Sequence, residues 1–442
     1  MVRAGEIDRP LSPSERWFWL VDQLSPANCV VRLRVRGPIG AYRLEEAADA
    51  VVAEYPLLRA IVVDGPRFVP SDDPHLPVLH RIVADPEEWR TVFDDQLTAP
   101  VDLSTAPGRL VDLAWRPGTS DELHDLILVF SHVLIDGRSM ASLASRILAV
   151  AFGAPGPAAT RPPIPAADDL IPPVHTRLLR CLRTNLAGQL TATVRRPVGL
   201  PGDLPPLPVR RTRTVHRTIE GDQLADLRAR CHRAGVTVNA ALAAALAQAL
   251  GELNRPGRSG VAGIGIPVDL RSRLQPPPAD DEPGMFTAVL PTFVPFGQNR
   301  SLWDAARAAK TQLARRLAHH ADLTGLAAIR YGCPRSLETG RRAVELVDRR
   351  APWNVTLSNL GRLTPPETPD PLPITALTVA GTNSCASALT VAVATFDTTL
   401  SITFCYVDTM LPRPTIESLA DHTLAPLTTR RATTHESRRP PR

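Results

Sequence analysis

The sequence predicts an α/β protein made of two lobes, each of which combines helices with strands. The chain has 442 residues, and a single hydrophobic core rarely grows beyond about 250–300 residues, so more than one core is expected. Helix-like and strand-like segments alternate in both halves without a fixed repeat. The 45 prolines are about double the ~5% share of an average protein, and they concentrate between Pro155 and Pro208, between the two halves.

In the first half, Arg43 to Glu54 has the pattern of an amphipathic helix. Its apolar residues recur at i, i+3, i+4, i+7 and i+8, on one face: Leu44, Ala47, Ala48, Val51 and Val52. Tyr55-Pro56 ends this helix, because the residue before a proline disfavours the helical conformation. Leu126 to Phe130 is a short apolar run, as expected of a strand covered on both sides. A second helix is predicted to open at Ser139, and its apolar residues are Met140, Leu143, Ile147 and Leu148.

The second half repeats these element types without repeating the sequence. Thr237 to Leu253 and Ser301 to Ala318 are predicted helices, with an apolar residue recurring on one face of each. Gly260 to Arg271 has the pattern of a strand. Three further strands, rich in β-branched residues, are predicted over 354–360, 388–395 and 400–407. Asp397-Thr398 is expected to form the hairpin turn between the last two.

These elements divide the chain into four parts. Residues 1–175 are expected to form the N-terminal lobe, 176–212 a linker rich in proline and arginine, and 213–428 the C-terminal lobe. Residues 429–442 are rich in threonine, arginine and proline, and a disordered tail is the simplest expectation for them.

The composition excludes several classes of function. The net charge is +5, but the five arginines and one glutamate from Arg430 onward contribute +4 of it, which leaves +1 for the body. The body shows neither a basic face nor interleaved aromatic residues, so nucleic-acid binding is not expected. No apolar run approaches the ~18–20 residues of a membrane span, and Met1 to Pro10 lacks the apolar stretch of a signal peptide. We therefore expect a monomeric, cytoplasmic protein.

The sequence shows no pattern of metal ligands. The six cysteines never form a C-x-x-C pair, which argues against a zinc site or a redox motif; they are Cys29, Cys181, Cys231, Cys333, Cys385 and Cys405. His319 and His320 are adjacent on a predicted helix, where neighbouring side chains point about 100° apart, so they cannot bind one metal as an i, i+4 pair could. Neither a metal nor a bound cofactor is expected.

The segment Ser131 to Gly137 (SHVLIDG) lies where the apolar strand ends and the second helix begins. A histidine at such an edge can hold one imidazole nitrogen toward a cavity, and its ordinary pKa of ~6.5 leaves the ring neutral near pH 7. His132 is therefore a candidate general base. Gly137 permits a positive φ or a close backbone approach, so the loop can turn Asp136 away from the histidine. Alternatively, His132 is a core histidine and Asp136 an acid at the helix entry.

His132, Asp136 and Gly137 match the H-x-x-x-D-G signature, and the chain resembles the superfamily of chloramphenicol acetyltransferase, nonribosomal peptide condensation domains, plant BAHD acyltransferases and polyketide-associated acyltransferases. Further segments resemble motifs of these proteins in the same order: Leu11–Leu20 (LSPSERWFWL), Tyr55–Arg59 (YPLLR), Pro267–Arg271 (PVDLR), Gly284–Phe286 with Leu290-Pro291, and Ser358–Gly361 (SNLG). An ordered set from about residue 11 to 361 is far more specific than any single motif.

The resemblance implies two chloramphenicol acetyltransferase-like lobes with an active-site tunnel between them. An acyl thioester, on the phosphopantetheine arm of an acyl or peptidyl carrier protein or on coenzyme A, would enter from one side. A small alcohol or amine acceptor would enter from the other. His132 would deprotonate the acceptor, and no metal is required because thiolate is a good leaving group. Asp136 would be structural, paired with Arg271 across the lobe interface, where an arginine can bind a buried carboxylate bidentately.

Two departures from the family pattern are visible. Ser131 stands where many condensation domains carry a second histidine, which points away from a standard peptide-bond-forming domain. The Asp-Phe-Gly-Trp-Gly run of the BAHD branch is absent, and Asn354–Asn359 lies near the equivalent place, so a plant-type enzyme is not expected. Ser358 or Asn359 could donate a hydrogen bond to the oxyanion, or could satisfy only the strand to which it belongs.

Three functions are compatible with these residues. The leading hypothesis is a free-standing condensation-type acyltransferase of bacterial secondary metabolism that forms an ester or an amide. The same histidine could instead promote cyclisation, dehydration or another proton transfer on a carrier-bound intermediate. The third alternative is a non-catalytic domain that docks a carrier protein, but the complete motif argues against it, since docking does not need the base.

Two other groups of side chains have an open interpretation. The aromatic run Trp17–Trp19 is expected to pack in the N-terminal helix, and one of its members is a candidate tunnel-lining residue. Arg210, Arg211 and Arg213 either attract an acidic carrier protein, since rim charges mainly raise the association rate, or belong to a solvated linker.

Overall fold

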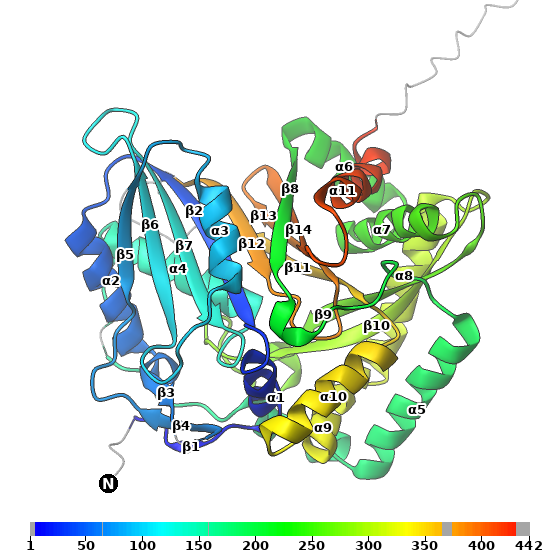
Figure 1. The fold of residues 1–442 in the computed structure, drawn as a ribbon, viewed down its shortest axis with the longest axis horizontal. Coiled ribbons are helices and arrows are strands. Elements are labelled where there is room, and N and C mark those ends of the chain that lie inside the picture. Colours follow the sequence, from blue (N-terminus) through cyan, green and yellow to red (C-terminus); the bar gives the residue numbers. More distant parts are fainter. Residues whose placement is uncertain (1–4, 64, 158, 365–373, 430–442) are drawn as a thin grey trace, which may run out of the picture.

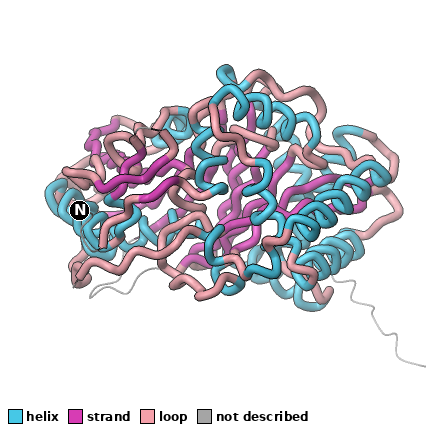
Figure 2. The backbone as a smooth tube through the Cα atoms, turned by 90° about the horizontal axis from the view of Figure 1, so that it is seen from below, coloured by secondary structure: helices cyan, strands magenta, loops and turns pink. Residues whose placement is uncertain are grey.

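The computed structural model describes residues 5–63, 65–157, 159–364 and 374–429, and Figure 1 shows them as two lobes side by side. Each lobe contains one large sheet, and Figure 2 shows strands in the interior with helices toward the outside. The predicted class, an α/β fold of two lobes that each combine a sheet with helices, is confirmed. The predicted tail, apart from Thr429, lies outside the described residues.

The sheet of the first lobe has five strands in the order β12-β2-β7-β6-β5. Their bounds are β2 (Asn28–Arg36), β5 (Val78–Val83), β6 (Gly108–Trp115), β7 (Leu123–Ser131) and β12 (Ile374–Gly381). The central strand β7 is buried along its whole length except at its first residue, as predicted for its apolar run. A small sheet lies at the edge of this lobe and consists of β1 (Arg9–Pro10), β4 (Arg67–Pro70) and β3 (Ala60–Val62).

Helices α2 (Ala41–Glu54) and α4 (Gly137–Ala151) pack together beside this sheet. The five apolar residues predicted to share one face of α2 are all buried, so that prediction is confirmed. Helix α4 begins at Gly137, earlier than the predicted start at Ser139, because the side chain of Asp136 caps it by accepting from the backbone N–H of Ser139. Helices α1 (Pro13–Asp22) and α3 (Trp89–Thr98) complete the lobe.

The sheet of the second lobe has six strands in the order β10-β9-β11-β13-β14-β8. Their bounds are β8 (Thr212–Glu220), β9 (Gly260–Asp269), β10 (Thr287–Phe296), β11 (Val355–Leu363), β13 (Leu389–Phe396) and β14 (Thr399–Val407). The predicted turn at Asp397-Thr398 is confirmed: it joins β13 to β14, and Asp397 adopts a φ of 48°.

The α-helices described after the linker segment are α6 (Gly221–Arg233), α7 (Val238–Asn254), α8 (Leu302–Ala318), α9 (Ala321–Gly332), α10 (Leu337–Arg350) and α11 (Arg413–Thr428), of which α9 and α10 pack against α1 of the first lobe. The predicted helices that begin near Thr237 and Ser301 are confirmed as α7 and α8. Thr237 and Ser301 are their N-caps, since each side chain accepts a hydrogen bond from a backbone N–H in the first turn.

The two lobes are not successive blocks of sequence. Strand β12 comes from residues 374–381, yet it pairs antiparallel with β2 of the first sheet, with Val379 opposite Val31. A boundary at residue 213 therefore does not separate the two sheets, because part of the predicted C-terminal lobe completes the N-terminal one. The buried side chains of Ala392, Ala394 and Cys405 join the first lobe's core, so the two halves share packing as well as hydrogen bonds.

The predicted linker, 176–212, contains an element that its prolines conceal. Helix α5 (Leu178–Arg195) occupies its first half and packs against α9. The linker prolines all follow α5 and do not interrupt it, which is why a proline-rich composition coexists with a helix.

Among the described residues, no single helix is long and apolar enough to cross a membrane. Only α6 and α7 pass such a test together, and they form a pair bent by 96°.

Candidate active site

His132 lies at the end of the buried strand β7, in the loop that leads to α4. Its backbone N–H donates to the carbonyl oxygen of Ala27 at 2.6 Å, which continues the β2–β7 ladder for one residue beyond Ser131. Ser131 is completely buried, and its hydroxyl accepts from the N–H of Val133. Ser131 stands where many condensation domains carry a second histidine, and here it stabilises the turn.

The imidazole of His132 is held by one hydrogen bond and one stacked ring. Nδ1 lies 2.8 Å from the carbonyl oxygen of Ile135, which can only accept, so Nδ1 carries the proton of the neutral ring. Nε2 then has a free lone pair, and no hydrogen bond to it is found within the described part of the chain. The ring of Phe18 stacks on the imidazole with centroids 4.6 Å apart, and burial lowers the pKa of His132 below its usual 6.5. The ring is therefore neutral and able to accept a proton at pH 7.

Asp136 points away from His132, as the sequence predicts, and its carboxylate is saturated. Oδ1 accepts from the backbone N–H and the hydroxyl of Ser139, at 2.8 and 3.0 Å. Oδ2 accepts from the N–H of Phe286 at 3.0 Å, the hydroxyl of Thr287 at 3.1 Å and Nη1 of Arg271 at 3.3 Å. Asp136 is thus a structural residue that caps α4 and ties the loop to the start of β10 in the other half of the chain.

Arg271 meets Asp136 as the sequence predicts, but not bidentately. Only Nη1 reaches the carboxylate, and the same nitrogen also lies 3.0 Å from Asp269. Nη2 donates to the hydroxyl of Ser139 at 2.7 Å and to the carbonyl oxygen of Glu282 at 3.1 Å. The guanidinium is 2% exposed and lies over the ring of Phe286. It divides its donors among four partners because the Asp136 carboxylate already accepts from backbone and hydroxyl groups.

At Gly137 the first turn of α4 and strand β11 approach each other closely, as the sequence suggests. A Cβ atom on Gly137 would lie 3.0 Å from a methyl group of Leu360, so β11 can lie directly over the first turn of α4. Its φ is not positive, so the space at this position, and not an unusual backbone angle, requires the glycine.

The two candidate oxyanion donors lie on opposite faces of β11. Val355 and Leu357 point into the core of the second lobe, whereas Leu360 packs against the first lobe's core. Since side chains alternate along a strand, Ser358 shares the face of Leu360. The side-chain oxygen of Asn359 accepts from the N–H of Gly361 at 2.9 Å in a local turn. Ser358 thus lies on the face of β11 that Leu360 turns toward the first lobe, Asn359 lies in a turn, and the structure records no contact of either with His132.

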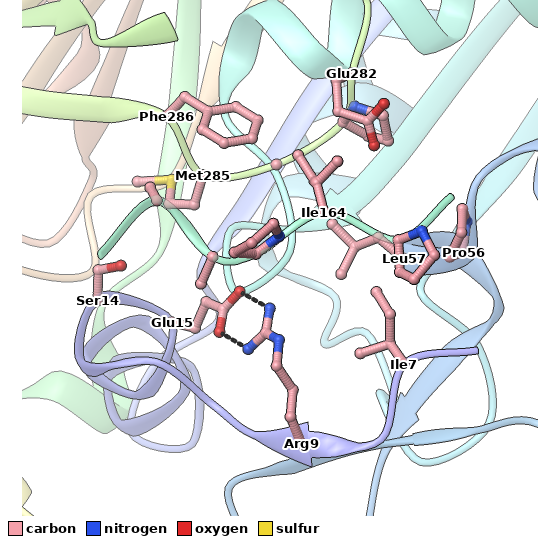
Figure 3. Close-up of a pocket in the computed structure, with 16 residues that line it drawn as sticks. Ile7, Arg9, Ser14, Glu15, Pro56, Leu57, Ile164, Glu282, Met285 and Phe286 are labelled. Atoms are coloured by element: carbon pink, nitrogen blue, oxygen red, sulfur yellow. Dashed lines mark hydrogen bonds and ion pairs between the residues drawn. The ribbon is translucent and has the colours of Figure 1, made fainter. Parts of the chain in front are cut away.

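A small pocket, with a cavity volume of about 20 Å³, adjoins the loop, and Figure 3 shows its lining. Gly284, Met285 and Phe286 form one wall, directly beyond their contacts with Asp136 and Ser139. The remaining lining is mostly apolar and includes Ile7, Leu57, Ile164 and four prolines. At its edge, Arg9 pairs bidentately with Glu15 at 2.7 and 2.8 Å. Burial raises the pKa of Glu282, on the opposite side, to about 7.

A second pocket, of about 470 Å³, lies between the lobes, with walls from α3 on one side and from β8 and the start of α11 on the other. His132 lines neither pocket, so a continuous tunnel through His132 stays a prediction. Within the described residues, no group of three or more His, Cys, Asp or Glu side chains is arranged to hold a metal ion.

Arg210 is not available as a surface charge for a carrier protein. It is buried and pairs with Asp348 at 2.7 Å. Arg213 pairs with Asp95 at 3.1 Å, which leaves Arg211 as the freely exposed member of the three. The sequence could not show this, because the carboxylates that neutralise Arg210 and Arg213 are distant in the chain.

Sequence reasoning missed two members of the site. Ser139 was expected only to open a helix, yet its hydroxyl binds both Asp136 and Arg271. Asp269 was noticed only as part of a motif, yet it is the second carboxylate of Arg271 and also pairs with Arg138 at 2.6 Å. A carboxylate two residues before a buried arginine is the signal that could have found Asp269. For the Trp17–Trp19 run, the structure selects Phe18 as the residue in contact with the histidine.

Comparisons with known proteins concern the family and the fold of the chain. Residues 208–410 match the family model described as phthiocerol/phthiodiolone dimycocerosyl transferase C-terminus. A search of curated proteins gave no match. Among solved structures, polyketide synthase associated protein 5 from Mycobacterium tuberculosis has a similar fold, with a TM-score of 0.68, 19% identity, and coverage of 96% of this chain and 99% of that one.

Two modular synthetase domains have the same fold. The epimerization domain from the third module of tyrocidine synthetase B gives a TM-score of 0.67 at 18% identity, over 96% of this chain and 98% of that one. The condensation domain of the monacolin K polyketide synthase gives 0.67 at 15% identity, with the same coverage. At these identities the likeness shows a shared fold. The family match over residues 208–410 and the shared fold both agree with the resemblance found in the sequence, to the superfamily of condensation-type acyltransferases.

Proposed function

We propose that this protein transfers an acyl group from a thioester to an alcohol or amine, in bacterial secondary metabolism and in the cytoplasm, and so forms an ester or an amide. The observation that carries the proposal is the state of His132. Its proton is fixed on Nδ1 by Ile135, its pKa is lowered by burial, and Nε2 has a free lone pair. A neutral imidazole with a fixed tautomer is the form that a general base requires.

In the proposed reaction, Nε2 of His132 takes the proton of the acceptor O–H or N–H as that atom attacks the thioester carbonyl. The tetrahedral intermediate carries its negative charge on the former carbonyl oxygen, and the hydroxyl of Ser358 is the proposed donor to it. Collapse breaks the C–S bond, and the imidazolium returns the proton to the departing thiolate. The products are the ester or amide and a free thiol, and the histidine ends neutral.

We further propose that one substrate carries an apolar group that contacts the wall formed by Gly284–Phe286. The lining of Ile7, Leu57, Ile164 and Met285 supports this, because apolar walls select apolar ligands. The matching family model is named for an enzyme that acts on phthiocerol and phthiodiolone. The donor is proposed to reach the site on a carrier protein, because a covalent arm presents its acyl group at high effective concentration and several structural relatives are domains of peptide or polyketide synthetases.

The test is to incubate the protein with an acyl group on a carrier protein and a panel of alcohols and amines, and to follow both by mass spectrometry. The proposal predicts loss of the acyl mass from the carrier and its gain by the acceptor, only when enzyme and acceptor are both present. Loss of water from the carrier-bound group without an acceptor would instead support cyclisation or dehydration. An unchanged carrier across donors and acceptors, with carrier binding retained, would favour the docking function.

A further inference from the structure

The large apolar side chains of helix α5 face solvent, whereas those of a surface helix in a globular protein usually face the core. The residues directed at the body are small or polar: Cys181, Thr184, Gly188, Thr191 and Ala192. The solvent side carries a line of large apolar residues that are 55–82% exposed: Leu179, Leu182, Leu186, Leu190 and Val194. Leu179, Leu186 and Leu190 fall within about 40° of one another on a helical projection, so they form one stripe.

The charges on this helix have one sign. No aspartate or glutamate occurs between residues 177 and 196, whereas five arginines do: Arg177, Arg180, Arg183, Arg195 and Arg196. Within the described part of the chain, none of these five guanidinium groups forms an ion pair, although arginines elsewhere on the surface, such as Arg67 and Arg217, do. Arg195 instead lies over the ring of Phe293, 5.9 Å from its centroid. Two arginines of other helices add positive charge near the ends of α5. The charge of Arg330 acts on the thiol of Cys181 near the start of α5, and Arg316 and Arg195 repel each other near its end.

The shape of this surface suits a flat partner. Figure 1 shows α5 at the outer margin of the molecule, where α9 is the helix behind it. The exposed apolar residues from Leu179 to Val194 extend over about 24 Å of the helix, at 1.5 Å per residue. Helix α5 contributes no side chain to either pocket described above. The surface is therefore distinct from the candidate active site.

We propose that α5 is an interfacial helix that holds the protein on the surface of an anionic lipid bilayer. The leucine stripe would insert at the boundary between head groups and acyl chains, and the arginines would bind the lipid phosphates. A helix that combines an exposed apolar stripe with unpaired arginines and no acidic residue has the chemistry of such helices. The proposal does not depend on the reaction at His132.

A second copy of the chain fits this surface less well. In an antiparallel pair of α5 helices, Arg180 and Arg183 would lie beside Arg195 and Arg196 of the other copy, and in a parallel pair each arginine would meet itself. Burial of the leucines would then bring like charges together, with no carboxylate on the helix to separate them. A bilayer of anionic lipids satisfies both the apolar stripe and the arginines.

The experiment is a flotation assay of the full chain with vesicles of phosphatidylglycerol and phosphatidylcholine. We expect the wild type to float with mixed vesicles at low salt, to float much less at high salt, and to float little with phosphatidylcholine alone. The double variant Leu186→Gln/Leu190→Gln should reduce binding by about tenfold or more. Arg180→Gln/Arg183→Gln should weaken binding to the anionic vesicles only.

The matched control is Leu79→Gln/Ile82→Gln, which removes two exposed apolar side chains from β5 in the other lobe. It should bind like the wild type, and the melting temperatures of all variants should agree, because every changed residue of the leucine pairs is exposed. Absence of wild-type flotation, or equal binding by the α5 and β5 variants, would overturn the proposal. So would a dimer in solution that the α5 leucine variant converts to monomer.

Discussion

At the scale of single residues, the candidate chemistry depends on the carbonyl oxygen of Ile135. That oxygen fixes the proton of His132 on Nδ1, and it can do so only while the loop keeps its shape. The loop ends at Asp136, whose carboxylate accepts five hydrogen bonds from Ser139, Arg271, Phe286 and Thr287. Asp136 and Arg271 are therefore positioning residues that act on the base through the backbone.

The lowered pKa of His132 predicts the pH dependence of the reaction. The base works when neutral, so kcat/KM should rise with pH along a limb whose midpoint lies below 6.5, and it should be level between pH 7 and 8. The free energy of unfolding should also rise with pH in the range of that limb. Because the folded histidine resists protonation, the unfolded state binds more protons below pH 6.5, and the free energy of unfolding falls there. A midpoint above 7 in a pH–rate profile would contradict the assigned environment.

Removal of either partner of the buried pair should destabilise the protein strongly. We expect Asp136→Ala and Arg271→Ala each to lower the free energy of unfolding by about 3–5 kcal/mol, because each leaves a charge buried without its partner. The double variant should lose less than the sum of the two. The neighbouring, more exposed pair of Arg138 and Asp269 supplies the control, and Arg138→Ala should cost about 1 kcal/mol or less. Additive losses in denaturant titrations of Asp136→Ala and Arg271→Ala would show that the two are not coupled.

At the scale of elements, the helices and turns that depend on neighbouring residues could be predicted, whereas pairing between distant strands could not. The helix that begins after Thr237 and the hairpin at Asp397 depend on neighbouring residues, so they could be predicted from sequence. Strand β12 could not, because its partner β2 lies more than 300 residues earlier and nothing in residues 374–381 identifies it. Helix α5 was concealed for a different reason: the proline-rich composition around it indicates a linker, although Leu179, Leu182, Leu186 and Leu190 recur at helical spacing.

Strand β12 should couple the stability of the two lobes. Val379 is 4% exposed in the first lobe's core and belongs to a strand supplied by the second half of the chain. Val379→Asp buries an unpaired carboxylate and should lower stability by about 3 kcal/mol or more. Thr375→Asp, on the same strand but exposed, is the matched control and should melt within a degree or two of the wild type. Equal melting of the two variants, followed by circular dichroism, would show that β12 is dispensable.

At the scale of the whole molecule, the order of motifs was more informative than any one of them. It predicted two mixed lobes and the meeting of Asp136 with Arg271, although these residues are 135 positions apart. It did not predict how Arg271 distributes its donors or that Arg210 is neutralised by Asp348. Those details depend on side chains brought together only by the finished fold, and sequence order carries no signal for them.

Delivery of the donor is also a property of the whole molecule. A carrier protein presents its acyl group on a covalent arm at an effective concentration of about millimolar order, which free coenzyme A does not. We expect kcat/KM for one acyl group to be higher on a cognate carrier protein than on coenzyme A. Steady-state assays of the two donors with the same acceptor decide the point. Equal values, or a preference for coenzyme A, would remove the carrier protein from the account and leave the chemistry of His132 unchanged.

The rate of acyl transfer by His132→Ala tests the central claim most directly. With a donor and an acceptor that the wild type uses, the variant should lose about 10²–10⁴ in kcat, since that is the usual contribution of a general base. Its melting temperature should stay close to that of the wild type, and His132→Gln, which keeps much of the side-chain volume, should be equally slow. A folded His132→Ala protein that retains more than about a tenth of the wild-type rate would contradict the claim that this histidine is the base.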